Sequence, residues 1–353
     1  MPAFAGGAAE PPLADSYYAL LRRCGGGDGA PNNGGARAAV AECELPMIDV
    51  GCLTSGGGGS SEAERAACAA AIARAAEEWG FFQVRNHGVA PELLDAMRRE
   101  QARLFRLPFE AKASGGLLGD SYRWGNPTAT SPRQLSWSEA FHVPLAAVSG
   151  DAACDFGGLT TLRDVTREVA GAMSKLAGTL ARVLAEALRP AAGERFPEGC
   201  DETTCFLRLN RYPPCPVSPP DGASFGLVPH TDSDFLTVLC QDHVGGLQLM
   251  KGAGWVAVKP IPGALIVNVG DLFQVQERGA QGDDQRDHRA LLRRLLPLPV
   301  LRLAHRRVRG AFSLPDVHVR GVQEKGAGRC QENREEDRAP QFPRLGFCMC
   351  HLV

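Results

Sequence analysis

A histidine and an aspartate two residues apart form the strongest chemical signal in this chain. His230 and Asp232 follow a short apolar run that begins at Phe225. If that run is a β-strand, its two-residue period directs both side chains to the same face. An imidazole beside a carboxylate supplies two ligands of a 2-His-1-carboxylate site, which leaves positions open on non-haem Fe(II). Taken alone, the pair also fits a surface loop, so its meaning depends on the rest of the chain.

Composition indicates a globular protein with a substantial core. The chain has 353 residues, 44% of them hydrophobic, and a formal net charge of -2 at pH 7, which fits one or two domains. This charge gives no bulk attraction to nucleic acid or to anionic membranes. We find no apolar run that could span a bilayer and no signal-peptide pattern. The 12 cysteines are scattered without CxxC pairs, which favours reduced thiols in an intracellular protein.

The first half of the chain is predicted to be mainly helical. Residues 1–43 are rich in Gly and Ala and predict a mobile leader, because they offer too little apolar surface to repay ordering. The elements expected after this leader are a strand at 45–50, a helix at 61–79, a strand at 81–85 and helices at 91–107 and 164–188.

From residue 204 the hydrophobic period becomes that of strands. The expected strands cover residues 205–212, 235–239, 247–250, 255–258 and 264–269. Short strands at such close spacing, separated by Gly and Pro turns, predict a jelly roll. The fold class expected is therefore α+β, with a double-stranded β-helix (jelly-roll) core behind an N-terminal helical and mixed domain.

Six segments carry a resemblance to a known family. They are LPMID at 45–49, WGFFQVRNHG at 79–88, LNRYPPC at 209–215, HTD at 230–232, GGLQ at 245–248 and IVNVGD at 266–271. In this order they resemble the plant 2-oxoglutarate/Fe(II)-dependent dioxygenases, from Leu45 to about Val275. Within that family, SYRWGNPTAT at 121–130 and LSWSEAFH at 135–142 are most similar to gibberellin 2-oxidases that act on C20 gibberellins.

The resemblance implies a set of roles for named residues. His230 and Asp232 would bind Fe(2+), and Tyr212 would reach the cosubstrate 2-oxoglutarate, with Asn210 packed nearby. From the residues alone, Tyr212 fits a core tyrosine equally well. Asp271 more readily holds a turn than touches the metal. The reaction implied consumes O2 and 2-oxoglutarate and hydroxylates C2 of a gibberellin, which inactivates the hormone.

The resemblance also implies partners and leaves rival functions open. The substrate expected is a gibberellin-like diterpenoid acid, handled by a monomer of the cytoplasm or the nucleus without nucleic-acid or membrane partners. Two alternatives stay open: a dioxygenase of another small plant metabolite, and a catalytically dead paralogue that only binds ligand. Four units are expected after the leader: an N-terminal dioxygenase domain at 44–150, a long joining helix at 151–200, a truncated jelly-roll domain at 201–275 and a tail at 276–353.

The tail departs from the family. Members continue with a third ligand histidine on a strand and then an Arg-x-Ser pair that binds the distal carboxylate of 2-oxoglutarate; neither is recognisable after Val275. His288 lies at nearly the expected distance from His230, but no strand pattern surrounds it, so it stays a weak candidate. We expect the tail not to continue the sheet, and the C-terminal strands to be missing or garbled.

A shift of reading frame accounts for this departure. If codons from Gln276 are back-translated and the first base is dropped, suitable synonymous codons can give Lys-Ser-Val-Glu-His-Arg. The same frame can give Glu-Arg-Tyr-Ser through residues 291–294. These are the missing ligand segment and the missing Arg-x-Ser, in the family's order. We therefore interpret residues 276–353 as out of frame, through a shifted splice junction or a gene-model error.

Overall fold

The computed structural model describes residues 9–25, 40–54, 59–113, 116–131, 134–149, 154–188, 205–214, 225–232, 234–252, 254–271, 301–304 and 348–352. The helices are α1 (Leu13–Gly25), α2 (Gly51–Thr54), α3 (Glu62–Trp79), α4 (Pro91–Phe105), α5 (Phe109–Ala113), α6 (Leu145–Ser149) and α7 (Thr160–Leu188). The strands of the first half are β1 (Glu42–Cys43), β2 (Met47–Asp49), β3 (Phe81–Arg85), β4 (Tyr122–Trp124) and β5 (Glu139–Pro144). The later strands are β6 (Cys205–Arg211), β7 (Phe225–His230), β8 (Leu236–Cys240), β9 (Leu247–Lys251), β10 (Gly254–Val258), β11 (Leu265–Val269), β12 (Leu301–Ala304) and β13 (Cys348–Leu352).

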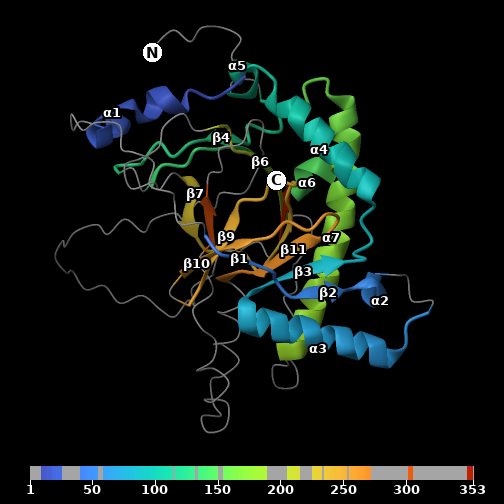
Figure 1. The fold of residues 1–353 in the computed structure, drawn as a ribbon. Coiled ribbons are helices and arrows are strands. Elements are labelled where there is room, and N and C mark those ends of the chain that lie inside the picture. Colours follow the sequence, from blue (N-terminus) through green and yellow to red (C-terminus); the bar gives the residue numbers. More distant parts are fainter. Residues whose placement is uncertain are drawn as a thin grey trace, which may run out of the picture.

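Two β-sheets form the centre of the molecule, with the long helices α4 and α7 to their right and α3 below them (Figure 1). One sheet has the strand order β1-β10-β9-β12-β7, and the other has the order β2-β3-β11-β8-β13-β6-β5-β4. A small apolar cluster joins the two sheets, with Leu249 from the first and Ile266 from the second. The jelly-roll core with a mixed N-terminal region, expected from the sequence, is confirmed.

The eight-stranded sheet has a mainly apolar outer face and an inner face that also carries several polar residues. The outer side chains pack against α3, α4 and α7 in the main core; among them are Phe82, Val84, Leu207, Leu209, Val238 and Val267. Residues that alternate with them point to the opposite face because the side-chain period of a strand is two. Several of these are buried and polar, namely Gln83, Arg208, Asn210, Thr237 and Asn268. The barrel interior is therefore lined with groups that need hydrogen-bond partners.

Local sequence explains how the first long helix delivers the chain to this sheet. Ser61 and Glu64 form a capping box at the start of α3, with the Glu64 N–H donating to Ser61 Oγ and the Ser61 N–H donating to Glu64. The helix ends at Gly80, whose φ of 65° is left-handed and costs a glycine little. β3 begins at the next residue, as predicted.

The expectation of a mobile leader is wrong for residues 9–25. Residues Leu13–Gly25 form α1, in which Leu13 and Tyr17 are 2% and 3% exposed. Both side chains pack in a cluster with Leu135 and Trp137, and the Tyr17 hydroxyl donates to the carbonyl of Ser136 at 3.1 Å. The composition of 1–43 as a whole hid this helix because its apolar positions are outnumbered by the glycines that follow.

The expectation that the tail adds nothing to the sheets is wrong for two segments. β12 lies antiparallel between β7 and β9, and β13 lies parallel between β6 and β8. Jelly rolls are antiparallel architectures, so β13 fills its place in the sheet with the wrong chain direction. The rest of the tail lies outside the described residues. No helix in the described ranges is long and apolar enough to cross a membrane.

Candidate active site

The structure brings His230 and Asp232 together inside the barrel. β7 ends at His230, and Asp232 follows in the loop that leads to β8. Nε2 of His230 lies 3.6 Å from Oδ1 of Asp232, and the two side chains are only 8% and 2% exposed. The convergence expected from the two-residue spacing is present, and burial removes the surface-loop alternative.

A hydrogen bond fixes the tautomer of His230. Its Nδ1 lies 2.9 Å from the carbonyl oxygen of Val228. Because a carbonyl only accepts, Nδ1 carries the proton and Nε2 presents its lone pair. Nε2 is buried and has no hydrogen-bond partner among the residues that the structure describes. An unpartnered buried nitrogen of this kind is costly, and binding a metal would satisfy it.

Two neighbouring strands orient Asp232. Its Oδ2 accepts hydrogen bonds from Thr237 Oγ1 at 2.6 Å and from Asn268 Nδ2 at 2.7 Å. Both donors lie on the inner face of the eight-stranded sheet, on β8 and β11. These bonds hold the carboxylate with Oδ1 toward His230, as partners of a metal ligand commonly do.

Two hydrogen bonds of Asp271 hold the loop that carries Asp232 in place. The backbone N–H of Asp271 donates to the carbonyl of Asp232 at 2.8 Å, and the Asp271 carboxylate accepts from Thr231 Oγ1 at 2.8 Å. Gly270 makes the close approach possible, since a Cβ there would lie 1.9 Å from the carbonyl oxygen of Asp234. The prediction that Asp271 holds a turn is confirmed.

The donor set fits ferrous iron as far as the described residues extend. An imidazole nitrogen and a carboxylate oxygen, both restrained by outer partners, match two thirds of a facial triad. No group of three His, Cys, Asp or Glu side chains that could hold a metal occurs within the described residues. His288 lies in the segment 272–300, outside them, so its assignment stays a prediction.

Tyr212 and Asn210 also face the interior with open hydrogen-bonding groups. Both are buried, and within the described part of the chain neither the Tyr212 hydroxyl nor Asn210 Nδ2 has a hydrogen-bond partner. Burial raises the pKa of Tyr212 well above its usual range, so the hydroxyl keeps its proton. Gly226 on β7 lets the ring lie close, because a Cβ there would stand 2.5 Å from it. Gln101 of α4 anchors this strand end by donating to the Asn210 carbonyl at 2.9 Å.

Sequence reasoning missed three interior residues near these groups. Arg208 is buried on β6, and His142 on β5 lies opposite it in register. Burial, followed by the charges of Arg208 and Arg123, lowers the pKa of His142 to about 4. Burial and the charge of Asp232 raise the pKa of Asp234 to about 7. The two-residue period that links Asn210 to Tyr212 also reaches Arg208, so that residue could have been found.

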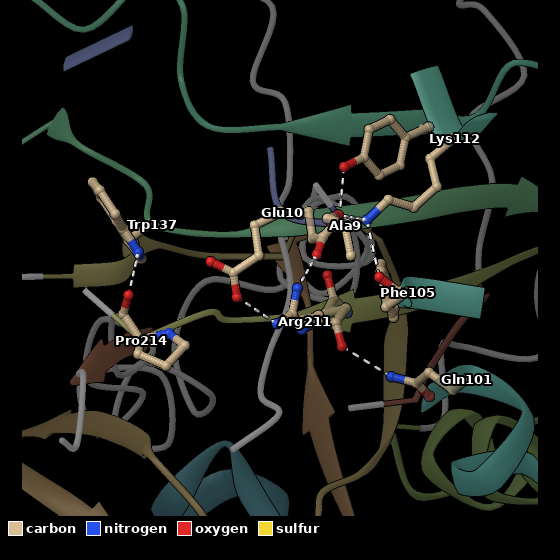
Figure 2. A network of polar contacts seen from close by, with 11 residues as sticks. Ala9, Glu10, Gln101, Phe105, Lys112, Trp137, Arg211 and Pro214 are labelled. Atoms are coloured by element: carbon tan, nitrogen blue, oxygen red, sulfur yellow. Dashed lines mark hydrogen bonds and ion pairs between the residues drawn. The ribbon is translucent and has the colours of Figure 1, made fainter. Parts of the chain in front are cut away.

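A second buried polar cluster surrounds Glu139, which alternates along β5 with the inward His142 and so points to the outer face of the same sheet. Its partners Lys112 and Arg211 are labelled in Figure 2. Its Oε2 accepts hydrogen bonds from Lys112 Nζ and from the Tyr122 hydroxyl, both at 2.5 Å. Its Oε1 accepts from Arg211 at 2.7 Å. Arg211 also pairs with Glu10 at 2.8 Å. The acids and bases of this Glu139 cluster balance one another.

Lys112 ties the Glu139 cluster to the segment before α1. Its Nζ also donates to the carbonyl of Ala9 at 2.7 Å and to that of Phe105 at 3.1 Å. All three N–H groups of the ammonium therefore have acceptors, as Figure 2 shows. We assign a structural role to this cluster, because none of its charges is left to bind a ligand.

Comparison with known families agrees with this fold and site. The family described as 2OG-Fe(II) oxygenase superfamily matches residues 203–294. The family described as non-haem dioxygenase in morphine synthesis N-terminal matches residues 45–153. The first match extends to residue 294, beyond Val275, up to which the sequence resemblance was recognised. Together, fold and matches define a 2-oxoglutarate/Fe(II) oxygenase, an enzyme that uses Fe(2+), 2-oxoglutarate and O2.

Individual relatives narrow the class. Gibberellin 2-beta-dioxygenase 6 of Oryza sativa subsp. japonica is 64% identical over 285 residues, which cover 78% of this chain and 77% of that protein. Gibberellin 2-beta-dioxygenase 8 of Arabidopsis thaliana is 51% identical over 246 residues, covering 69% and 68%. The chain belongs to the family of the plant gibberellin 2-beta-dioxygenases.

Solved structures with ligands share the fold. The crystal structure of JOX2 in complex with 2OG, Fe and JA has a TM-score of 0.55 and 28% identity, and the match covers 80% of this chain and 78% of that one. The dioxygenase for auxin oxidation 1 from Arabidopsis thaliana, in complex with 2-oxoglutarate, has a TM-score of 0.53 and 26% identity, covering 76% and 88%.

Proposed function

We propose that this protein hydroxylates a gibberellin at C2 and so inactivates the hormone. The observation that carries this proposal is the 64% identity to a gibberellin 2-beta-dioxygenase, joined to the buried pair of His230 and Asp232 inside the barrel. The substrate is therefore a small diterpenoid acid. We place the protein in the cytoplasm or the nucleus as a monomer, which size-exclusion chromatography and a fluorescent fusion test.

Each interior residue has a separate task in this reaction. His230 and Asp232 hold the metal, and Thr237 and Asn268 keep the carboxylate turned toward it. Tyr212 and Asn210 offer hydrogen-bond donors to a carboxylate of the cosubstrate. When bound, Fe(2+), 2-oxoglutarate and O2 supply the oxidising chemistry. The protein binds, orients and keeps water from the reacting atoms.

The preference for C20 gibberellins rests on the segments 121–130 and 135–142. Parts of both form β4 and β5 at the edge of the eight-stranded sheet. Trp137 lies in the second segment, in the apolar cluster beneath α1, and its Nε1 donates to the carbonyl of Pro214 at 3.2 Å. Pro214 closely follows Tyr212, which connects this segment with the strand end that we assign to the cosubstrate.

The tail sets how much activity this chain has. We propose that the third ligand and the Arg-x-Ser pair are encoded in the shifted frame that begins near Val275. Two ligands hold iron more weakly than three, and loss of a buried arginine fork costs roughly 30-fold or more in carboxylate affinity. The chain as written should therefore bind iron and cosubstrate weakly, unless His288 completes the site.

Parallel assays of two proteins test the proposal. One is the chain as written, and the other has the reading frame restored by removing one base ahead of codon 276. Each is incubated with Fe(II), 2-oxoglutarate and either a C20 or a C19 gibberellin, and succinate and hydroxylated product are measured by mass spectrometry. We expect the restored protein to hydroxylate the C20 substrate at C2, and the chain as written to do so more slowly.

Three other results would contradict parts of this proposal. Turnover by neither protein, with tight binding of gibberellin by both, would indicate a ligand-binding paralogue. Hydroxylation of a different plant acid would move the enzyme to another substrate class. Full activity of the chain as written, lost on His288→Ala, would show that the third ligand lies in the present frame.

A further inference from the structure

Two cysteines meet where the short helix α2 lies against α3. Cys52 is half-buried on α2, and Cys68 on α3 is 8% exposed. Cys68 belongs to the main hydrophobic core, and Cys52 packs against that core. Neither residue has a task in the reaction proposed above. Two thiols in one contact either fill space as small apolar side chains or form a pair that can be oxidised together.

A crossed pair of contacts brings the two thiols together. The Cys52 Sγ lies 3.9 Å from the carbonyl oxygen of Glu64, which is on α3. The Cys68 Sγ lies 3.4 Å from the carbonyl oxygen of Asp49, two residues before α2 begins. Each thiol therefore reaches the backbone at the other's position, since Glu64 precedes Cys68 by about one helical turn. Both sulfur atoms lie in the same contact between α2 and α3.

The pKa of Cys68 agrees with this geometry and separates the roles of the two thiols. Burial, followed by the neighbouring Cys52 thiol and the charge of Asp49, raises the pKa of Cys68 to about 12. Because the thiolate is the reactive form of cysteine, Cys68 is a poor nucleophile toward reagents in solution. It can react only with a sulfur that is held against it. Cys52 is the more exposed thiol of the pair, so a reagent reaches Cys52 first.

Hydrogen bonds hold the backbone on both sides of Cys52. Asn86 Nδ2 donates to Asp49 Oδ2 at 2.7 Å, and the Thr54 hydroxyl donates to the Asn86 carbonyl at 2.8 Å. These bonds fix α2 at both of its ends, so Cys52 stays beside Cys68. A second thiol held in place in this way reacts at a high effective concentration.

We propose that Cys52 and Cys68 form a redox-modification site, which a low-molecular-weight disulfide such as oxidised glutathione converts into a disulfide between α2 and α3. The Cys52 sulfur attacks one sulfur of the reagent, the reagent's S–S bond breaks, and the leaving thiolate takes up the Cys52 proton. The Cys68 sulfur then attacks the Cys52 sulfur, the mixed S–S bond breaks, and the second leaving thiolate takes up the Cys68 proton. Two protein thiols are oxidised, and one reagent disulfide is reduced to two thiols.

The consequence of this bond is stability rather than catalysis. Cys68 packs in the core on the outer side of the eight-stranded sheet, whereas His230 and Asp232 lie inside the barrel. The disulfide closes a loop of about 15 residues and so constrains the unfolded chain. We expect oxidation to raise the melting temperature by about 5 °C or more and to leave the affinity for Fe(II) unchanged. The inference therefore does not depend on the proposed function.

Peptide mapping of the oxidised full chain tests the site. The folded protein is incubated with oxidised glutathione, the remaining thiols are alkylated, and the protein is digested with trypsin without reduction. Arg65 lies between the two cysteines, so the digest separates them: peptide 66–74 carries Cys68 alone, and peptide 38–65 carries Cys52 and Cys43. We expect mass spectrometry to find these two peptides joined by a disulfide, and thermal unfolding to show the higher melting temperature.

Three variants identify the sulfur atoms. Cys52→Ser and Cys68→Ala should each abolish both the joined peptides and the rise in melting temperature. Cys52 is half-buried, so its variant serves even if the core variant at Cys68 does not fold. Cys43→Ser is the matched control, because Cys43 is also half-buried and lies in the same peptide but on β1; it should retain both effects. Glutathione that stays on Cys52 without forming the link, no reaction at either thiol, or a link through Cys43 would overturn the proposal.

Discussion

Two buried polar clusters lie on opposite faces of β6 and differ in how fully their groups are satisfied. On the outer face, Glu139 forms ion pairs with Lys112 and Arg211, and Lys112 also donates a hydrogen bond to the carbonyl of Ala9. On the inner face, His230 Nε2 and the Tyr212 hydroxyl are buried, and no described residue forms a hydrogen bond with either atom. Folding alone favours the first arrangement, because unpaired buried groups are costly. The second is expected only where a ligand completes the bonding.

This contrast separates structural from functional charge without reference to any relative. Glu139 is more deeply buried than His230, so burial alone would rank the wrong cluster first. Unsatisfied bonding capacity, rather than the number of ionisable groups, points to the site. The predictions below use this difference: changes in the inner cluster should reduce binding, and changes in the outer cluster should reduce stability.

The largest effect is expected at the metal pair. His230→Leu removes a ligand nitrogen and should weaken Fe(II) binding by more than about 100-fold, beyond the loss caused by an outer partner, and reduce turnover to background. Stability of the metal-free protein should be unchanged or higher, because a buried nitrogen without a partner is removed. Anaerobic Fe(II) titration and thermal unfolding measure the two quantities.

Asn268→Leu is the matched control for the metal pair. It removes one donor to Asp232 and leaves both ligands in place, so it should weaken Fe(II) binding only about 10- to 100-fold. If His230→Leu bound Fe(II) as tightly as wild type, the pair would not be a metal site.

The next effect is expected in the outer cluster. Glu139→Gln leaves Lys112 buried without its anion and leaves Arg211 with Glu10 alone. It should lower the free energy of unfolding by about 3–5 kcal/mol. Glu10→Gln changes the exposed end of the same network and should cost less than about 1 kcal/mol. Urea denaturation compares the two variants. Equal stabilities would mean that the network contributes nothing as a unit.

We expect the stability of the protein to depend on pH through His142, which lies on the inner face. The folded-state pKa of His142, about 4, lies below the ordinary 6.5, so between these values the unfolded chain takes up a proton that the folded chain excludes. This contribution to stability is complete above pH 6.5 and falls away as the pH drops toward 4, by at most about 3 kcal/mol. The groups whose charges act on His142 are Arg208 and Arg123.

Chemical denaturation at a series of pH values measures the effect of His142. His142→Gln should have a shallower loss of stability than wild type in this window, because the titrating group is gone. If the two pH profiles ran in parallel, His142 would not be held neutral in the fold.

Local patterns in the sequence explain what could be predicted. The capping box at Ser61, the glycine at position 80 and the alternation along β6 act within a few residues, and the elements that they predict are present. The approach of His230 to Asp232 was also predictable, since their spacing needs only a strand and a turn. The tautomer of His230 and the partners of Asp232 depend on backbone and strands that pack only in the folded protein.

The features that the sequence did not predict depend instead on contacts between residues far apart in the chain. Helix α1 is stabilised by Leu135 and Trp137, which are more than a hundred positions away, so the composition of the leader could not reveal it. Glu139 draws its partners from three other elements, α5, β4 and β6, and no local pattern connects them. β13 pairs in parallel with β6 and β8, a pairing that the alternation of its own residues does not specify.

The smallest effect gives the most direct comparison, because two tyrosines differ mainly in their surroundings. The Tyr122 hydroxyl donates to Glu139, whereas the Tyr212 hydroxyl is buried and has no hydrogen-bond partner in the ranges that the structure describes. Tyr122→Phe should therefore lower the free energy of unfolding by about 1–3 kcal/mol, and Tyr212→Phe should leave it unchanged or raise it slightly. Affinity for 2-oxoglutarate should fall about 10-fold in Tyr212→Phe and stay constant in Tyr122→Phe. Denaturation and calorimetric titration on both variants test this reversal. A loss of stability in Tyr212→Phe equal to that in Tyr122→Phe would place the Tyr212 hydroxyl among the structural groups, and the distinction between the two faces of β6 would fail at that residue.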